Sequence, residues 1–271
     1  TLAKTGWRVA IIEQSNTMYG GTCINIGCIP TKTLVHDAEL QHDFATAMQR
    51  KTSVVSFLRD KNFHNLADLE NVDVIAGRAE FVDNHTVRVM QSTGTLELRG
   101  EKIFINTGAQ STIPDIEGLS STPGVFDSTG LLNLTQRPQR LCILGGGYIG
   151  VEFASMFANF GSQVTIFEAA PLFLPREDRD IADAIADILR DKGVELILNA
   201  KVQSVSSHDG AVQLQMPEGE QVVDALLVAS GRKPATEQLQ LKKAGVDVND
   251  RGGIIVNKYL RTSADNIWAM G

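Results

Sequence analysis

The pattern of apolar and polar positions divides the chain into short strands separated by turns and by a few helices. Runs of strand length are predicted at residues 7–12, 72–75, 80–82, 86–90, 95–98, 102–106, 141–144, 163–167, 195–198, 202–206, 212–216, 222–228, 253–256 and 266–270. Helical spacing predicts helices at 33–50, 54–69, 151–160 and 179–192. In the last helix, Ile181, Ile185, Ile188 and Leu189 are expected on one side. Strands that alternate with helices are typical of an α/β fold.

Residues 141–168 combine an apolar strand, a glycine-rich turn, a helix and a second strand that ends in an acid. The turn, 145–150, matches G-x-G-x-x-G in the full context of a dinucleotide-binding unit. Its glycines allow a tight turn and bring a pyrophosphate onto the helix N-terminus. Glu168 is expected to accept the ribose 2′-OH and to repel a 2′-phosphate, which favours NADH over NADPH, although Arg176 weakens this preference. The coenzyme contacts expected from this pattern are Gly145, Gly147, Ile149, Gly150 and Glu168.

Residues 20–32, Gly-Gly-Thr-Cys-Ile-Asn-Ile-Gly-Cys-Ile-Pro-Thr-Lys, place two cysteines in a frame of glycine, proline and lysine. Five residues of regular helix rise about 7.5 Å, more than the Cα spacing of about 4.4–6.8 Å that a disulfide tolerates. Cys23 and Cys28 can therefore form a disulfide only if the backbone between them is distorted, which the intervening glycine and the following proline permit. The charge of Lys32 favours a nearby thiolate. The segment predicts a reducible dithiol.

Two other interpretations of this cysteine pair fit the sequence less well. A structural zinc site needs four ligands, and the remaining cysteine, Cys142, lies in an apolar run with no histidine near it in sequence. Two unrelated buried thiols would not need the glycine, proline and lysine frame. His36, His42 and His64 are expected to be solvated or packed, because no acid or cysteine accompanies them at metal spacing.

Length and charge narrow the class of protein. A chain of 271 residues with 43% hydrophobic and 21% charged residues is long enough for two domains. A net charge of −7 argues against nucleic acid or an anionic membrane as the main partner. No transmembrane run or signal peptide is expected, and the cysteine usage favours the cytoplasm. The chain starts at Thr1 without methionine and stops at Gly271 as a strand ends, so we expect a fragment truncated at both ends.

The segment 20–32 resembles the active-site signature of the class I pyridine nucleotide-disulfide oxidoreductases, which include dihydrolipoamide dehydrogenase, glutathione reductase and mercuric reductase. The sequence of residues 13–36 and 174–180 is most similar to the bacterial branch of this family that is linked to reactive-chlorine resistance and to copper(II) and mercuric ion reduction. The resemblance implies two Rossmann-like nucleotide-binding domains of the FAD/NAD(P)-binding fold, the first of them incomplete. It places the FAD-binding domain at 1–126, the NAD(P)H-binding domain at 127–247 and a return segment at 248–271.

The resemblance also implies a reaction. Hydride passes from NAD(P)H through FAD to a Cys23–Cys28 disulfide and on to an acceptor such as copper(II) or mercuric ion. Cys28 faces the flavin, and Cys23 attacks a disulfide or transiently binds the metal ion. Lys32 lies near the flavin, Glu152 pairs with this lysine, and Tyr148 acts as a gate. For Tyr148 and Glu152 a packed ring and a solvated helix charge remain open as alternatives.

The remaining contacts and partners come from the same resemblance, except that Glu13 also ends an apolar strand, where an acid accepts ribose hydroxyls. The expected FAD contacts are Glu13, Gly20, Gly21, Thr22, Lys32, Ala79, Thr107 and Gly108. Gly231 is expected near the nicotinamide, and Tyr148 and Glu152 are also expected to bind the cofactors. The complete protein is expected to be a homodimer formed through a C-terminal domain outside this sequence. Two alternative functions stay open, a dihydrolipoamide or glutathione-type reductase and a non-catalytic NAD(H)-binding fragment.

Overall fold

The computed structural model describes residues 2–270, so Thr1 and Gly271, where the predicted fragment begins and ends, lie outside the described residues. The chain forms two compact units. Unit 1 comprises Thr1–Asn25, Ser56–Gln110 and Arg232–Gly271, and unit 2 comprises Ile26–Val55 and Ser111–Gly231. The division into domains at 1–126, 127–247 and 248–271 stays a prediction, because compactness does not report which nucleotide each part binds.

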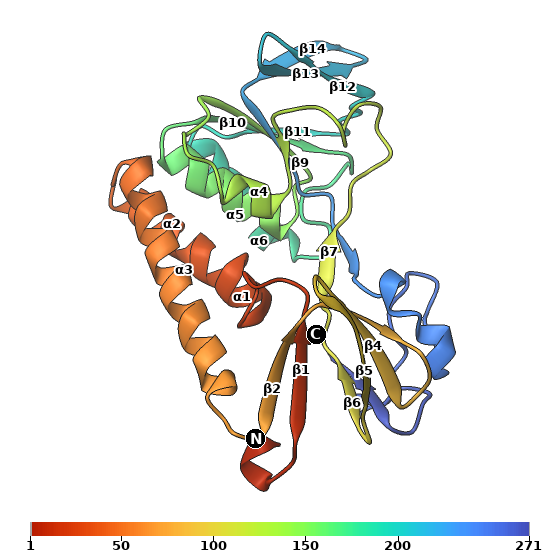
Figure 1. The fold of residues 1–271 in the computed structure, drawn as a ribbon. Coiled ribbons are helices and arrows are strands. Elements are labelled where there is room, and N and C mark those ends of the chain that lie inside the picture. The colour runs from red at the N-terminus through yellow and green to blue at the C-terminus, as the bar shows by residue number, and fades with distance from the viewer. Residues whose placement is uncertain (1, 271) are drawn as a thin grey trace. The chain divides into compact units, whose positions relative to one another are not determined.

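Unit 1 is built from short strands (Figure 1). β1 (Val9–Glu13) pairs in parallel with β2 (Val72–Ala76), and β17 (Ile267–Ala269) pairs in parallel with β6 (Ile103–Ile105). The strands β3 (Arg78–Phe81), β4 (Thr86–Gln91) and β5 (Gly94–Arg99) form an antiparallel sheet. Its short elements include η1 (Ala3–Thr5), α1 (Gly21–Asn25), β16 (Arg232–Pro234), η2 (Glu237–Leu239) and η3 (Leu241–Ala244). Phe81, Val89, Ile105, Leu241 and Ile267 lie in one apolar core.

Unit 2 contains a five-stranded parallel sheet in the order β11-β10-β9-β15-β8. Its strands are β8 (Val125–Phe126), β9 (Arg140–Leu144), β10 (Gln163–Glu168), β11 (Glu195–Leu198) and β15 (Ala225–Val228). Its helices are α2 (Cys28–Glu39), α4 (Ser128–Leu131), α5 (Tyr148–Asn159) and α6 (Arg179–Asp191). A three-stranded antiparallel sheet is formed by β12 (Ser204–His208), β13 (Ala211–Met216) and β14 (Gly219–Val223). The division of the chain between the two units falls within β7 (Ala109–Ser111), after Gln110.

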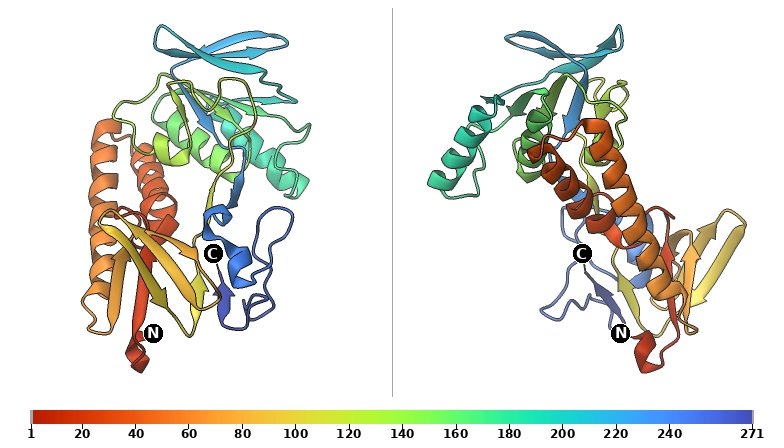
Figure 2. Two further views of the ribbon diagram at one scale, coloured as in Figure 1. Left: turned by 45° about the vertical axis from the view of Figure 1, so that its right-hand side comes forward. Right: turned by 90° about the vertical axis from the view of Figure 1, so that its left-hand side faces the viewer.

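Alternate residues of the parallel strands face opposite sides of the sheet in unit 2. Ile143 and Ile166 pack in one core with residues of α5 and α6, whereas Cys142 and Phe167 pack in a second core with residues of β12 and β13. Both faces are therefore covered, by helices on one side and by the antiparallel sheet on the other, as Figure 2 shows. This explains why the inner residues of these strands are mostly apolar, with Thr165 of β10 as the polar exception.

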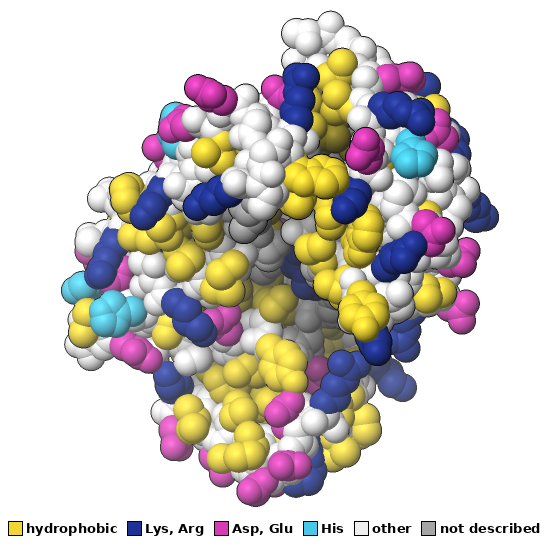
Figure 3. All heavy atoms as spheres, turned by 90° about the horizontal axis from the view of Figure 1, so that it is seen from below, with side chains coloured by type: hydrophobic (Ala, Val, Ile, Leu, Met, Phe, Trp, Pro, Cys, Tyr) yellow, Lys and Arg dark blue, Asp and Glu magenta, His cyan; other side chains and the backbone are white. Residues whose placement is uncertain are grey.

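The surface mixes charged and apolar side chains, and hydrophobic groups lie between Lys, Arg, Asp and Glu on the face shown in Figure 3. Phe104 is 44% exposed and stacks on Trp268 with ring centroids 5.3 Å apart. Exposed apolar residues of this kind are common in folded proteins. None of the helices within residues 2–270 combines the length and the apolar character needed to cross a membrane.

The predicted helix break at residues 51–53 is wrong. α2 ends at Glu39 and α3 runs from Phe44 to Ala67, so the break lies at residues 40–43. Gln41 adopts a left-handed conformation with φ 58°, and Asp43 caps α3 by accepting a hydrogen bond from the backbone N–H of Thr46. Asp43 could have indicated the start of α3 in the sequence, but the apolar periodicity continues across this cap residue and hides the break.

Two of the expected strands also differ from the structure. The expected strand at 222–228 is two strands, because Asp224 leaves the ladder to pair with Arg140. The expected strand at 253–256 is absent from the described chain except for one bridge between Val248 and Ile254.

The expected apolar side of α6 is confirmed only in part, because Leu189 is buried and Ile185 packs against the core, but Ile181 and Ile188 do not. Ile181 and Ile188 are 50% and 55% exposed, whereas Ala182, Ala186 and Leu189 are buried. The small side chains of Ala182 and Ala186 let the helix pack closely, so the buried side is centred on them and on Leu189, and Ile181 and Ile188 lie at its edge.

Candidate functional site

The cysteine segment is interrupted where the sequence predicts distortion. Cys23 lies in α1 and Cys28 is the first residue of α2, so the backbone between them is not a continuous helix. Gly27 separates the two helices with φ −128° and ψ −117°. Both cysteines are exposed, whereas Cys142 is buried and its burial raises the pKa of its thiol. The exposed pair is thus available to react, and the third cysteine belongs to the core.

Lys32 and Glu152 meet where α2 packs against α5 in unit 2. Lys32 Nζ lies 2.5 Å from Glu152 Oε1, and Thr31 Oγ1 donates to the same oxygen at 3.2 Å. The side chain of Glu152 is 26% exposed and that of Lys32 is 71% exposed. The structure therefore brings together the two residues that the resemblance pairs, and their catalytic role stays a prediction.

The glycine-rich turn joins β9 to α5. Gly145 has φ 113°, and a Cβ atom there would lie 2.6 Å from the carbonyl oxygen of Ala229. A Cβ atom at Gly150 would lie 2.0 Å from the carbonyl oxygen of Gly145. Gly147 is the N-cap of α5 and supplies no side-chain cap. The first backbone N–H groups of α5 are therefore available to an anion such as a pyrophosphate.

Glu168 ends β10 beside this turn. Its Oε2 accepts a hydrogen bond from the N–H of Gly146 at 2.7 Å, and its Oε1 accepts one from the N–H of Ala170 at 2.8 Å. The carboxylate thus holds the glycine turn in addition to any contact with a ribose. A carboxylate has about four lone-pair sites, so it can still accept further hydrogen bonds.

Tyr148 is the first residue of α5 and is 67% exposed. Its hydroxyl donates to Glu177 Oε1 at 2.5 Å. The hydrogen bond and the negative charge of Glu177 raise the pKa of Tyr148. Sequence reasoning missed Glu177, because it lies in a run of charged residues with no periodic signal.

The residues expected at FAD lie at turns and strand ends. Glu13 ends β1 and accepts a hydrogen bond from the N–H of Ser15, and Gly20 and Gly21 have φ 92° and 74°. Gly108 has φ 67°. The other expected contacts lie as follows: Thr22 is exposed in α1, Ala79 is half-buried in β3, Thr107 is exposed after β6, and Gly231 follows β15 with φ 126°.

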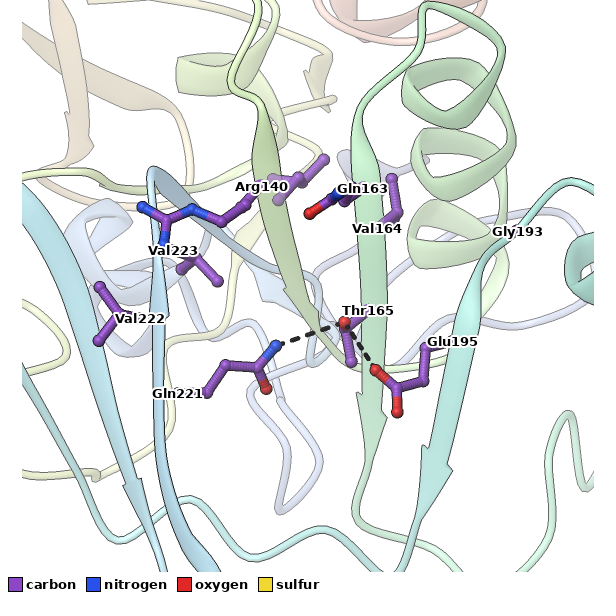
Figure 4. Close-up of a pocket in the computed structure, with 10 residues that line it drawn as sticks. Arg140, Gln163, Val164, Thr165, Gly193, Glu195, Gln221, Val222 and Val223 are labelled. Atoms are coloured by element: carbon purple, nitrogen blue, oxygen red, sulfur yellow. Dashed lines mark hydrogen bonds between the residues drawn. The ribbon is translucent and has the colours of Figure 1, made fainter.

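A separate cavity of about 250 Å³ lies at the amino ends of β9, β10 and β11 (Figure 4). Thr165 Oγ1 donates to Glu195 Oε2 at 3.2 Å and accepts from Gln221 Nε2 at 3.4 Å. The cavity is at the sheet edge opposite the glycine turn, since that turn follows the carboxyl end of β9. Dinucleotides bind at the carboxyl edge, so this cavity is not the coenzyme site.

Two of the three histidines, His42 and His64, have acids beside them, although the sequence suggested none at such spacing; both side chains are still partly exposed, as expected. His64 Nδ1 lies 3.0 Å from Asp68 Oδ1, and Asp60 is on the other side of the ring. His42 Nδ1 lies 3.1 Å from Asp37 Oδ1. The helical i±4 spacing of Asp60 and Asp68 was the signal that could have found the first set. Within the described part of the chain, no group of three or more His, Cys, Asp or Glu residues is placed to hold a metal ion.

Comparison with known proteins identifies the family. The family model for "Pyridine nucleotide-disulphide oxidoreductase" matches residues 1–271. The chain belongs to this family. The resemblance drawn from residues 20–32 is therefore confirmed, and so is the α/β fold with nucleotide-binding architecture.

The relatives of this chain carry names of different enzymes. The chain is 68% identical over 271 residues to the "Probable pyridine nucleotide-disulfide oxidoreductase RclA" of Escherichia coli, covering 100% of this chain and 62% of the relative. It is 34% identical to a mercuric reductase of Bacillus cereus, covering 97% of this chain and 44% of the relative. It is 36% identical to a dihydrolipoyl dehydrogenase of Staphylococcus aureus, covering 99% and 61%.

A solved structure supports the fold. The "Cu(II) complex of HOCl-induced flavoprotein disulfide reductase RclA from Escherichia coli" matches with a TM-score of 0.98 and 67% identity, covering 100% of this chain and 61% of that chain. The chain thus spans about three fifths of the length of the Escherichia coli and Staphylococcus aureus relatives and 44% of the mercuric reductase.

Proposed function

We propose that this chain is the nucleotide-binding part of a flavoenzyme that transfers hydride from NADH through FAD to a Cys23–Cys28 disulfide. The contact between α2 and α5 carries the proposal. α2 begins at Cys28, α5 begins at the glycine-rich turn, and Lys32 and Glu152 join the two helices at 2.5 Å. A single packed pair of helices therefore links the reactive thiol to the coenzyme turn.

The residues present fit both cofactors. For NADH, the glycine turn leaves no room for a Cβ atom at Gly145, the first N–H groups of α5 have no side-chain cap, and Glu168 presents a carboxylate. For FAD, Glu13 ends a parallel strand, and Gly20 and Gly21 take positive φ where α1 begins. When bound, FAD accepts a hydride and delivers two electrons to a disulfide.

The residues of the chain then have defined tasks. α2 starts at Cys28, so this residue lies at the positive end of the helix dipole. Lys32 supplies a positive charge on the same helix, and Glu152 with Thr31 holds its direction. Reduction of the disulfide consumes two electrons and two protons and yields the two thiols of Cys23 and Cys28.

The acceptor that we propose is a soft metal ion, either copper(II) or mercuric ion. Thiolates bind Cu(I) and related soft ions well. One dithiol reduces two copper(II) ions to Cu(I) or one mercuric ion to the metal, and the disulfide re-forms with release of two protons. A mercuric reductase and a copper(II) complex occur among the relatives, which supports this choice. A disulfide substrate is the second candidate, supported by the relation to dihydrolipoyl dehydrogenase. The homodimer and the cytoplasmic location stay predictions.

An anaerobic NADH titration of the complete protein tests the proposal. We expect bleaching of the flavin and a long-wavelength charge-transfer band that is lost in Cys28→Ser and retained in the matched variant Cys23→Ser. Turnover with copper(II), mercuric ion, lipoamide and glutathione disulfide then identifies the acceptor. A flavin that NADH does not reduce, or a band that persists in Cys28→Ser, contradicts the proposed electron path.

A further inference from the structure

The hydrogen bond between Tyr148 and Glu177 spans the carboxyl edge of the sheet in unit 2. Tyr148 follows the glycine turn after β9, and Glu177 belongs to the segment 169–178 that follows β10. The same segment contacts the turn at a second point, because a Cβ atom at Gly146 would lie 3.2 Å from the ring of Phe173. The segment therefore closes on the turn where a dinucleotide is expected to bind.

The segment is held firmly enough to position Glu177. The guanidinium of Arg179 donates to the carbonyl oxygens of Phe173, Leu174 and Glu177 at 3.0, 2.5 and 3.1 Å. Leu174 has φ 44°, a left-handed conformation that is costly for leucine, and its side chain is only 6% exposed. The backbone N–H of Glu177 also donates to the carbonyl of Leu174 at 3.0 Å. Glu177 is thus presented by an ordered turn.

We propose that Glu177 is a positioning residue that holds Tyr148 across the glycine turn, and that the coenzyme must break this hydrogen bond to bind. The inference rests on the proposed function in one respect only, the assignment of the turn to NADH. The pyrophosphate of the coenzyme is anionic and repels the carboxylate of Glu177. This repulsion favours separation of the Glu177 carboxylate from the hydroxyl of Tyr148. Arg176, which is exposed next to Glu177, can then face the coenzyme.

The proposal predicts that loss of either partner tightens coenzyme binding. Tyr148→Phe keeps the ring and removes the hydroxyl, and Glu177→Gln keeps the length and removes the charge. Loss of one such hydrogen bond should lower the dissociation constant of the coenzyme by about threefold or more. The double variant should bind no more tightly than the tighter single variant, because both changes remove the same bond.

Titration calorimetry of the complete protein with NAD⁺ measures binding independently of flavin reduction. Glu218→Gln, an exposed change elsewhere in unit 2, is the matched control and should leave the dissociation constant unchanged. A second readout is the ionisation of Tyr148, isolated as the difference in ultraviolet absorbance between the wild type and Tyr148→Phe. Since Glu177 raises the pKa of Tyr148, Glu177→Gln should lower this pKa.

The outcomes separate the two proposals. Equal dissociation constants in wild type, Tyr148→Phe and Glu177→Gln overturn the role of Glu177, as do weaker binding in Glu177→Gln or an unchanged tyrosine ionisation. Failure of NADH to reduce the flavin of the wild type overturns the proposed function instead, while the NAD⁺ and tyrosine measurements still decide the role of Glu177.

Discussion

Replacement of Arg50 by methionine should destabilise the helix that carries Cys28 and Lys32. Asp37 lies on this helix, α2, and is completely buried. Its Oδ1 accepts a hydrogen bond from Arg50 Nη1 at 2.7 Å and lies 3.1 Å from the ring of His42. Its Oδ2 has no hydrogen-bond partner anywhere in residues 2–270. Arg50 is therefore the main charged partner of a buried carboxylate.

The magnitude follows from burial and exposure. Removing one partner of a fully buried ion pair costs about 3–5 kcal/mol, because the other charge stays buried. The side chain of Arg50 is 51% exposed, so water can reach part of the vacated position. We therefore expect Arg50→Met to lower the free energy of unfolding by about 2 kcal/mol, between this limit and the ~1.5 kcal/mol of one charge-assisted hydrogen bond.

A double-mutant cycle separates the buried charge from lost packing. Asp37→Leu in the Arg50→Met background removes the unpaired carboxylate, so the double variant should recover about 1 kcal/mol or more relative to the sum of the single changes. Arg190→Met is the matched control, since Arg190 pairs at 2.7 Å with Asp187 and both side chains are more than half exposed. Its expected cost is below about 0.5 kcal/mol.

Urea unfolding followed by circular dichroism gives the free energies, and hydrogen exchange of the amides in α2 tests whether the loss is local. The reasoning is refuted if Arg50→Met costs no more than Arg190→Met, or if the changes at positions 37 and 50 are strictly additive. Either result would mean that the carboxylate of Asp37 reaches water.

Three further predictions concern the glycine turn, the buried thiol and an exposed histidine. Gly145→Ala should abolish NAD⁺ binding measured by calorimetry and lower the melting temperature. The φ of 113° and a carbonyl oxygen 2.6 Å from the added Cβ exclude a side chain at this position. Gly147→Ala is the control and should keep the melting temperature, because its added Cβ would have no atom within 4 Å. Cys142 should react with Ellman's reagent only after unfolding, since burial raises its pKa, whereas the other two cysteines of the reduced native protein react quickly; equal rates for all three would contradict this. The pKa of His64 is raised above 6.5 by the hydrogen bond and charge of Asp68, so this pair stabilises the fold below pH 6.5 and loses its effect as the pH rises through the higher folded value. A nuclear magnetic resonance titration should show a lower pKa for His64 in Asp68→Asn, and an unchanged value would exclude the contact.

The sequence by itself determined the features that depend on neighbours along the chain. The glycine turn at 145–150 is recognisable because strand, turn, helix and acid follow one another within about 30 residues, the length of one such unit. The cysteine frame at 20–32 is equally local, and the structure breaks the helix at Gly27 as the spacing predicts. Glycines with positive φ are required by the local path of the chain, whereas the close approach of Ala229 to Gly145 is a contact between distant segments.

Only the tertiary structure decided the features that depend on packing between distant segments. The burial of Asp37, the hydrogen bond of Glu177 to Tyr148 and the exposed side of α6 leave no mark in periodicity. The sequence around a charged residue looks the same whether its side chain faces water or packs against a helix from a distant part of the chain. Its environment depends on which surfaces pack together. This packing is determined by the total apolar area buried in the core and not by the neighbouring residues in sequence.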